Sequence, residues 1–250
     1  MRLELATWME VDAYLKRSRG IIVPVGSTEQ HGPTGLLGTD WMTAETIAHG
    51  IAERLDVLVT PTLTFGMAQH HLAFAGTISL RPTTLIAVVR DVVASLACHG
   101  FDRIYFVNGH GGNVDTVNAA FADIHSEVSF GNAAPSRRRV RCALRNWYES
   151  EGVESLSASF YGTSDGAHGT ASEIAVTQFR YPDHIKTHIL DPAVAPGLDR
   201  EIHDAFDLRL RYPDGRIGSN PALATPEQGK ILTETAIASL TADYIHFLDT

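Results

Sequence analysis

The chain passes from a strand-forming run into a polar turn within Ile21-Ile22-Val23-Pro24-Val25-Gly26-Ser27-Thr28-Glu29-Gln30-His31-Gly32-Pro33. The first five residues are apolar throughout, which is typical of a strand that is buried on both faces of a sheet. The same order recurs where the strand Arg103–Val107 is followed by the turn Asn108-Gly109-His110-Gly111-Gly112-Asn113. Apolar residues at helical spacing begin at Trp41 after the first turn and at Val114 after the second. The sequence therefore predicts repeated strand–turn–helix units.

The remaining elements extend this alternation. The sequence predicts short strands at 57–59 and 140–144, the second near a sheet edge, a helix that Thr83 or Thr84 caps and Gly100 ends, and helices near 171–180, 198–211 and 227–247. Residues 146–170 have no clear period and many Ser and Gly, which predicts a long functional loop. This order predicts an α/β fold with a mostly parallel sheet and helices on both faces. Ligands of such sheets bind beyond the carboxyl ends of the strands, where both polar turns lie.

Composition limits the class of protein. The 250 residues correspond to one or two domains, and the absence of repeats, low-complexity tracts and linkers in the sequence favours a single domain over 1–250. The apolar share of 44% and the charged share of 20% are those of a globular protein. A net charge of −9 argues against a nucleic-acid partner, and no apolar run reaches the roughly 20 residues that span a membrane. The two cysteines, Cys98 and Cys142, are far apart, and no apolar signal core follows Met1, so a cytoplasmic protein is expected.

Three candidate metal ligands follow the first strand. Glu29 and His31 lie two residues apart on extended chain, so their side chains point to the same side. A carboxylate beside an imidazole forms half of a metal site, whereas the alternative is a capping acid and a surface histidine. Asp40 directly precedes a helical pattern, and its local sequence favours an N-cap. However, the intervening Gly-Pro-Thr-Gly turn at 32–35 would return Asp40 to the side of Glu29 and His31.

Two further histidines lie on glycine-rich turns. His110 has glycine on both sides, which predicts a ligand; a phosphate cradle is the alternative, but Val114 occupies the position of the third glycine of a dinucleotide fingerprint. His168 lies on a glycine-containing loop just before Glu173, which opens a helical pattern. An acid in the first turn of a helix is also explained by the helix dipole. The weaker candidates, for contact with a substrate, are His71, Gly111 and Gly112.

These segments together resemble the creatininase (creatinine amidohydrolase) family. The likeness extends along nearly the whole chain and rests on Val23–Pro33, Gly38-Thr39-Asp40, Gly76-Thr77-Ile78-Ser79-Leu80, Asn108–Asn113 and Ala224-Thr225-Pro226-Glu227-Gln228-Gly229. The resemblance implies a three-layer α/β/α fold, a hydrolase with two metal ions and a homo-oligomer, either a hexamer or a dimer.

The resemblance also implies a set of metal ligands. Residues that match ligands of the family by position are Glu29, His31, Asp40 and His110, with Asp40 as the bridge. Creatininase proper has the pattern N-G-H-Y-E-N, in which the Glu is a ligand, whereas this chain has Gly112 at that position. Members with H-G-G resemble a pattern in which a Glu five residues after a loop histidine replaces it. His168 and Glu173 have that spacing, which makes Glu173 the fifth expected ligand.

Two departures from the family pattern concern the substrate. Thr34 stands where many members have a second histidine, and Glu173-Ile174-Ala175 replaces Glu-Thr-Ser; both count against creatinine itself. The five ligands would hold two divalent cations of zinc, manganese or iron(II), and one hydroxide would neutralise the cluster. We therefore expect hydrolysis of a C–N bond in a small amide or cyclic amide, with His168 passing a proton to the leaving nitrogen.

Other functions stay open on the sequence alone. The same metal ions could open a ring carbon–carbon bond, remove a formyl group or cleave a small modified peptide. From a different class, the turn at Asn108–Asn113 could belong to a metal-independent module that binds phosphate or a partner. The partner expected of the enzyme is a small-molecule substrate, with neither nucleic acid nor a membrane.

Overall fold

The computed structural model describes residues 1–131 and 139–249, and a parallel sheet forms its centre. In the described residues four strands take the order β2-β1-β3-β4, and their bounds are β1 Gly20–Val25, β2 Leu58–Val59, β3 Arg103–Asn108 and β4 Arg141–Asn146. Neighbouring strands pair in parallel throughout. β4 lies at an edge of the sheet, which confirms the prediction for this strand.

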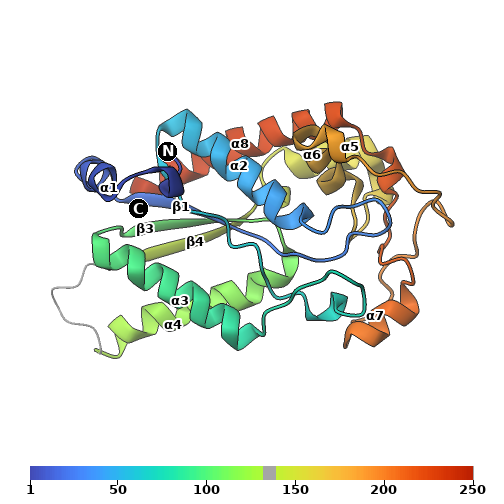
Figure 1. The fold of residues 1–250 in the computed structure, drawn as a ribbon, viewed down its shortest axis with the longest axis horizontal. Coiled ribbons are helices and arrows are strands. Elements are labelled where there is room, and N and C mark those ends of the chain that lie inside the picture. The colour runs from blue at the N-terminus through green and yellow to red at the C-terminus, as the bar shows by residue number, and fades with distance from the viewer. Residues whose placement is uncertain (132–138, 250) are drawn as a thin grey trace.

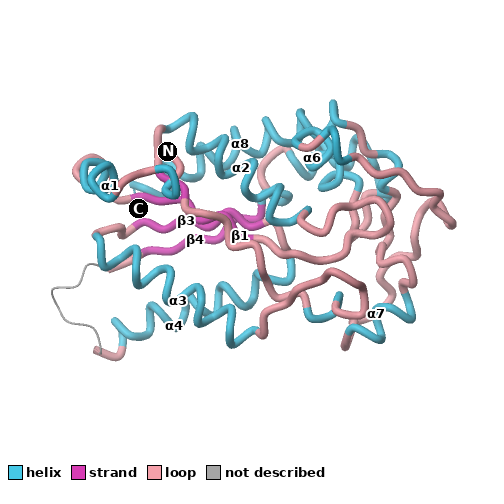
Figure 2. Tube along the Cα trace, in the orientation of Figure 1, coloured by secondary structure: helices cyan, strands magenta, loops and turns pink. Residues whose placement is uncertain are grey.

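Helices cover both faces of the sheet and produce three layers (Figure 1). One face carries α2 Thr39–Leu55 and α8 Pro226–Asp249, and the other carries α3 Pro82–His99 and α4 Val114–Ser129. α6 Ala171–Arg180 packs against α2 and α8 beyond the end of the strands. The other helices are α1 Trp8–Leu15, α5 Val153–Tyr161 and α7 Ala205–Arg211. Short 3-10 helices occupy Leu3–Leu5, Gln69–His71, Gly111–Asn113, Trp147–Glu149, Gly162–Ser164, Pro182–His184 and Pro221–Leu223. The fold is therefore the expected three-layer α/β/α arrangement, and Figure 2 shows the long loops gathered at one end of the sheet.

The core lies between these layers. All six residues of β1 are buried, and so are the last five residues of β3. Burial on both faces explains why these strands are continuous apolar runs rather than alternating ones. Among the described residues α3 is the one helix whose length and composition would suffice to cross a membrane. Its inward side chains belong to the main hydrophobic core: Leu85, Val89, Val93 and Leu96.

Two predicted segments are wrong in extent. Residues 146–170 do not form a loop throughout, because they contain α5 and two 3-10 helices. Only Val153 and Tyr161 of the nine residues of α5 are buried, too few to give an apolar period. The helix predicted over 198–211 is limited to α7, whose N-cap residue Asp204 accepts hydrogen bonds from two backbone N–H groups.

The amino end of α3 also differs from the prediction. Pro82 is the first helical residue and Arg81 is the N-cap, so neither Thr83 nor Thr84 caps the helix. Proline suits this first position because its missing N–H has no partner there in any case. Gly100 ends the helix at a φ of 110°, as predicted. α1 has no counterpart among the predicted helices.

Candidate metal centre

The carboxyl ends of β1 and β3 lie side by side, because Val25 pairs with Asn108 in the parallel register. The polar turns after both strands therefore lie at the same end of the sheet, beyond the carboxyl ends of the strands, as predicted. The first turn of α2 packs directly onto these ends. A Cβ atom at Gly109 would lie 2.0 Å from the carbonyl oxygen of Asp40, so glycine there allows α2 to bring Asp40 against the strand ends.

The structure brings all five expected ligands together at this end of the sheet. Two groups of possible ligand atoms lie within 4.8 Å of one another and share Asp40: the first is Glu29, Asp40 and His110, and the second is His31, Asp40 and Glu173. A third group within the same limit is Glu29, His31 and His168. Each of the first two groups combines one imidazole with two carboxylates, which is a donor set suited to zinc, manganese or iron.

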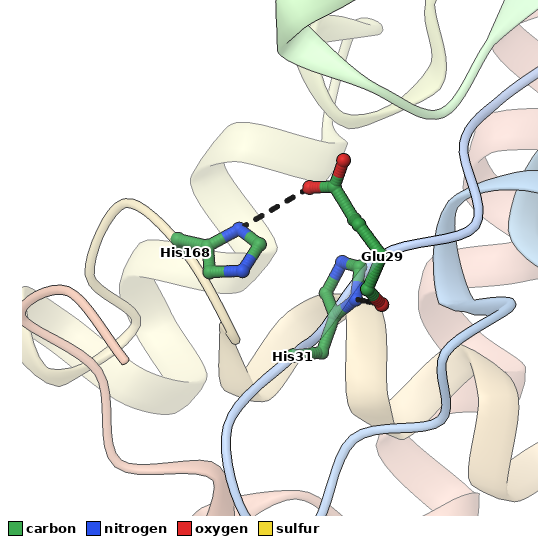
Figure 3. Close-up of side chains that lie close together, drawn as sticks. All are labelled: Glu29, His31 and His168. Carbon is green, nitrogen blue, oxygen red and sulfur yellow. Dashed lines mark hydrogen bonds and ion pairs between the residues drawn. The ribbon is translucent and has the colours of Figure 1, made fainter. Parts of the chain in front are cut away.

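Glu29 and His31 point to the same side, as their spacing predicts (Figure 3). The ring of His31 is 1% exposed, so the alternative of a surface histidine is wrong. Its Nε2 atom lies 3.0 Å from Asp40 Oδ1 and 3.8 Å from Glu173 Oε2. Its Nδ1 atom lies 3.1 Å from the carbonyl oxygen of Glu29, which holds the ring in this orientation. The nitrogen of His31 that faces the carboxylates is therefore the one available to a metal ion.

Asp40 reaches the cluster through the tight return predicted at 32–35. Gly35 donates a backbone hydrogen bond to the carbonyl of His31 and closes this turn. Gly38 is the N-cap of α2, and Asp40 is the second residue of the helix, so the N-cap interpretation of Asp40 is wrong. Its two oxygens diverge, with Oδ1 toward His31 and Oδ2 3.3 Å from Nδ1 of His110.

His110 is held by backbone groups on a turn that Asn108 stabilises. The side-chain amide of Asn108 donates to the carbonyl of His110 over 2.7 Å. Nε2 of His110 lies 2.9 Å from the carbonyl oxygen of Met67 and 3.3 Å from Glu29 Oε2. His110 thus has Nε2 against a main-chain carbonyl and Glu29, and Nδ1 against Asp40. This arrangement is typical of histidines that bind a metal ion, because the carbonyl fixes the tautomer.

Glu173 lies in the first turn of α6 and also faces the cluster. Thr170 and Glu173 form a capping box at the start of α6, in which Oε1 accepts a hydrogen bond from the Thr170 N–H over 2.5 Å. The second oxygen, Oε2, faces His31. His168 approaches from the loop ahead of this helix, and its Nδ1 atom lies 3.8 Å from Glu29 Oε1 (Figure 3).

Three oxygen atoms of the buried carboxylates lack a hydrogen-bond donor in the part of the chain that the structure describes. Both oxygens of Glu29 and Oδ2 of Asp40 are buried without a hydrogen bond among the described residues. Burying an uncompensated carboxylate is costly, so these oxygens fit a site for cations. The donor set and the orphaned oxygens together match a divalent metal ion better than a phosphate, which would face the carboxylates of Glu29, Asp40 and Glu173.

The charges of the cluster shift every pKa within it. Burial raises the pKa of Glu29 to about 7, although the neighbouring His110 opposes the shift. Burial disfavours the protonated form of His31, but the charges of Asp40 and then Glu173 outweigh it and raise its pKa to about 10. Burial acts likewise on His110, whose pKa the charges of Glu29 and Asp40 raise to about 9. For Asp40, burial favours the neutral form, but His31 and His110 hold its pKa well below its usual range. Protons on the two imidazoles thus balance the carboxylates, and a divalent cation would displace them.

A cavity of about 510 Å³ opens onto Asp40 and Glu173. Gly111 lines it, as expected of a residue that contacts a substrate. Gly112 lies against the ring of His110 instead, where a Cβ atom would be 2.4 Å from Nε2. His71 is 2% exposed and lies beside Glu29 rather than along the cavity. A second cavity of about 580 Å³, between α3, α4 and the start of β4, contains none of the candidate residues.

Two aromatic residues of this cavity are not among the predicted site residues. Trp147 and Tyr148 line it and lie directly after the carboxyl end of β4. The rule that places ligands beyond the carboxyl ends of parallel strands could have identified them, since β4 itself is predicted.

Comparison with known proteins gives consistent results. A family model described as creatininase, creatinine amidohydrolase, matches residues 4–244. Creatinine amidohydrolase of Pseudomonas putida is 34% identical over 244 residues, which are 94% of this chain and 92% of that protein. Mycofactocin precursor peptide peptidase of Mycobacterium ulcerans is 37% identical over 116 residues, 43% of this chain and 46% of the relative, so the chain matches about half the length of that relative. The solved structure of a mutant creatininase of Zn-Zn type covers 100% of this chain and 98% of its own, with a TM-score of 0.83 and 22% identity.

Proposed function

Because the chain belongs to the creatininase family, and with it to the metal-dependent hydrolases, we propose that it holds two divalent cations and hydrolyses a C–N bond in a small amide or cyclic amide. The observation that carries this proposal is the position of Asp40, which directs one oxygen toward His31 and the other toward His110. A carboxylate shared in this way is suited to bridge two cations.

Each cation has its own set of ligands in this proposal. One would be held by Glu29, Asp40 and His110, and the other by His31, Asp40 and Glu173. The three carboxylates bring three negative charges and two divalent cations bring four positive ones, so one hydroxide neutralises the cluster. The Zn-Zn type of the creatininase structure supports zinc as the cation that these residues bind. Manganese and iron(II) suit the same nitrogen and oxygen donors.

The cations and His168 have separate parts in the proposed reaction. When bound at this place, two divalent cations would supply an activated water and polarise a carbonyl oxygen. Nε2 of His168 lies 2.7 Å from the carbonyl oxygen of Gln30, which leaves Nδ1 to face the cluster. Burial and the neighbouring charge of His31 lower the pKa of His168 to about 3, so its ring is neutral at pH 7. We assign to Nδ1 of His168, which faces the cluster, the transfer of a proton from the attacking water to the leaving nitrogen.

The cavity limits the size and character of the substrate. Its volume of about 510 Å³ suits a small molecule or the end of a peptide, and Trp147 and Tyr148 give it an aromatic wall. The similarity to a mycofactocin precursor peptide peptidase favours a small modified peptide as the second candidate substrate. Opening of a ring carbon–carbon bond and removal of a formyl group use the same groups and belong in the same test.

The function is tested by comparing metal-free and metal-loaded protein on a panel of compounds. The panel contains linear amides, lactams, formamides, a cyclic diketone and short peptides, and products are identified by mass spectrometry. We expect release of an amine from at least one amide only after zinc or manganese is added. Cleavage of the diketone alone would contradict the C–N specificity. If the protein takes up no metal but binds inorganic phosphate, the result would contradict the enzyme and favour the phosphate-binding module.

We propose in addition that the chain assembles as a homo-oligomer, a hexamer or a dimer. Apolar side chains are exposed on α7, close to the end of the sheet that carries the site: Phe206 and Leu210 are each 81% exposed. Side chains of this size are commonly covered in an assembly. Light scattering at micromolar concentration gives the mass directly, and a mass of one chain, 27.2 kDa, would contradict the proposal.

A further inference from the structure

Gln30 lies between two of the proposed ligands, and its side chain connects several buried groups. It is 5% exposed. Oε1 accepts a hydrogen bond from the Gly32 N–H over 2.8 Å. Nε2 lies 3.0 Å from the carbonyl oxygen of Gly215, 2.9 Å from His71 Nδ1 and 3.0 Å from His168 Nε2. The amide therefore has more neighbours than it has hydrogens to donate.

Two backbone groups fix which end of this amide is which. The N–H of Gly32 can only donate, so the atom it meets is an oxygen. The carbonyl of Gly215 can only accept, so the atom it meets carries hydrogen. Gly215 has a φ of 86°, and a Cβ atom there would lie 1.9 Å from Gln30 Oε1. Glycine at this position thus permits the backbone to close over the amide, and the orientation of Gln30 follows from the main chain alone.

The two amide hydrogens then determine the proton on each histidine. One hydrogen is donated to Gly215, and one remains for the two rings. His168 cannot accept it, because a lone pair on its Nε2 would also face the main-chain carbonyl of Gln30 at 2.7 Å. His168 must therefore carry its proton on Nε2 and donate it to that carbonyl. The second amide hydrogen is left for Nδ1 of His71, so His71 carries its own proton on Nε2.

The proton on His71 lies beside a proposed ligand, at an ion-pair distance rather than in a hydrogen bond. Nε2 of His71 lies 3.2 Å from Oε1 of Glu29, whereas Oε2 of Glu29 faces His110 at 3.3 Å. A positive N–H edge on Oε1 leaves Oε2 as the oxygen that faces the proposed cation.

We infer that Gln30 is a positioning residue that sets the tautomer of His71 and, through it, the oxygen that Glu29 presents to a metal ion. The inference deepens the proposed function and rests on it for the role of Glu29 as a ligand. The assignment of the protons stands on hydrogen-bond geometry among Gln30, Gly32, Gly215 and the two rings.

The protons are observed directly by nitrogen-15 NMR of histidine-labelled protein under magic-angle spinning, which places no limit on the size of an assembly. The signals of the two rings are assigned with His71→Gln and His168→Gln variants. At pH 7 we expect both rings to carry their proton on Nε2, in metal-free and in zinc-loaded protein. A proton on Nδ1 of His71 in the unsubstituted protein would overturn the inference. This measurement needs no variant of Gln30, so the test does not depend on how such a variant folds.

A Gln30→Glu variant tests the causal step. Its carboxylate has no N–H to donate, so His71 should move its proton to Nδ1 or take up a second one. His168 should keep its proton on Nε2, since its acceptor is the main-chain carbonyl, and it serves as an internal reference. Gln69→Glu makes the same chemical change at an exposed position two residues from His71 and should alter neither ring. An unchanged His71 in Gln30→Glu, with His168 also unchanged, would refute the positioning role.

Metal content is measured on the same samples and separates the two proposals. Protein that shows the expected tautomers but binds no zinc would refute the proposed function and leave the proton assignment intact. Protein that binds two equivalents of zinc but carries the His71 proton on Nδ1 would refute the proton assignment and leave the proposed function intact.

Discussion

Gly109, at the end of β3, lies so close to Asp40 of α2 that a Cβ atom at residue 109 would be 2.0 Å from the Asp40 carbonyl oxygen. Gly111, two residues further on, differs: the nearest atom that its Cβ would meet is the hydroxyl oxygen of Tyr148, at 3.5 Å. The two glycines of one turn thus have different tasks. Gly109 sets the distance between α2 and the sheet, and Gly111 borders the cavity.

A Gly109→Ala substitution should therefore weaken metal binding without touching a ligand. The methyl group must push the first turn of α2, and with it Asp40, away from His110; overpacking of this kind costs about 1–3 kcal/mol. Gly111→Ala is the matched control and should keep both stability and metal content. The measurements are urea unfolding and metal content after dialysis. If the two variants behaved alike, the close approach of α2 would not be what places Asp40.

Replacing Asp40 by alanine should abolish binding of both cations, because its two oxygens face the two ligand sets. Asp115→Ala is a suitable control, since Asp115 is exposed and is the second residue of α4, as Asp40 is of α2. The control should lose only the helix-dipole term, about 0.3–1 kcal/mol, and no metal. Elemental analysis gives the equivalents per chain. Retention of one full equivalent by Asp40→Ala would contradict a bridging carboxylate.

The parts of the site that consist of residues close together along the chain can be predicted from the sequence. Glu29 and His31 are two residues apart, and the return at 32–35 spans few residues, so the spacing allows Asp40 to lie beside them, although its local sequence favours an N-cap. Glu173 meets His31 across 142 positions, a distance that local spacing cannot specify and that the family pattern supplied. The role of Gln30 was not predicted, because its partners Gly215 and His168 lie far away in sequence.

Whether a strand or helix could be predicted from the sequence depends on how many of its side chains are buried. β1 and β3 are buried on both faces, so each is an unbroken apolar run that the sequence displays plainly. α1 and α5 are short and bury only one or two side chains each, so they carry no apolar period. The capping box of Thr7 and Glu10 is a local signal that would have revealed α1.

The stability of the metal-free protein should depend on pH through its buried imidazoles. His31 and His110 have pKa values of about 10 and about 9 in the fold against 6.5 ordinarily, so their contribution is complete below pH 6.5 and is lost as the pH rises through 9 to 10. Glu29 acts in the same direction between pH 4.5 and about 7, because its pKa is raised. We expect the free energy of unfolding of metal-free protein to fall from pH 6.5 to pH 9.

Zinc should reverse this trend. It binds unprotonated imidazole, so the stabilisation that it adds should grow over the same pH range. Urea unfolding at pH 6.5 and pH 9, with and without zinc, gives all four values. A zinc effect of equal size at both pH values would show that His31 and His110 do not release protons to the metal.

His168→Ala should retain about two equivalents of metal and lose most of its turnover. Proton transfer by a positioned side chain contributes about 10²–10⁴-fold to a rate, and no other described ring places an unprotonated nitrogen at the same point. The measurements are metal content and the rate on an amide found with the substrate panel. Because His168, Glu29 and His31 lie close enough to hold an ion among themselves, loss of one metal equivalent in this variant would instead make His168 a ligand.

A His71→Phe substitution should weaken zinc binding although His71 is not among the proposed ligands. Phenylalanine preserves a ring at this position but removes the N–H group that lies 3.2 Å from Glu29 Oε1. Loss of a group that orients a ligand typically costs about 10–100-fold in metal affinity. His70→Phe is the matched control, because His70 contacts the ring of His71 at 4.3 Å but reaches none of the carboxylates. Competition with a chelator measures both affinities. Equal affinities in the two variants would mean that Glu29 is oriented by its burial and by His110 alone, without help from His71.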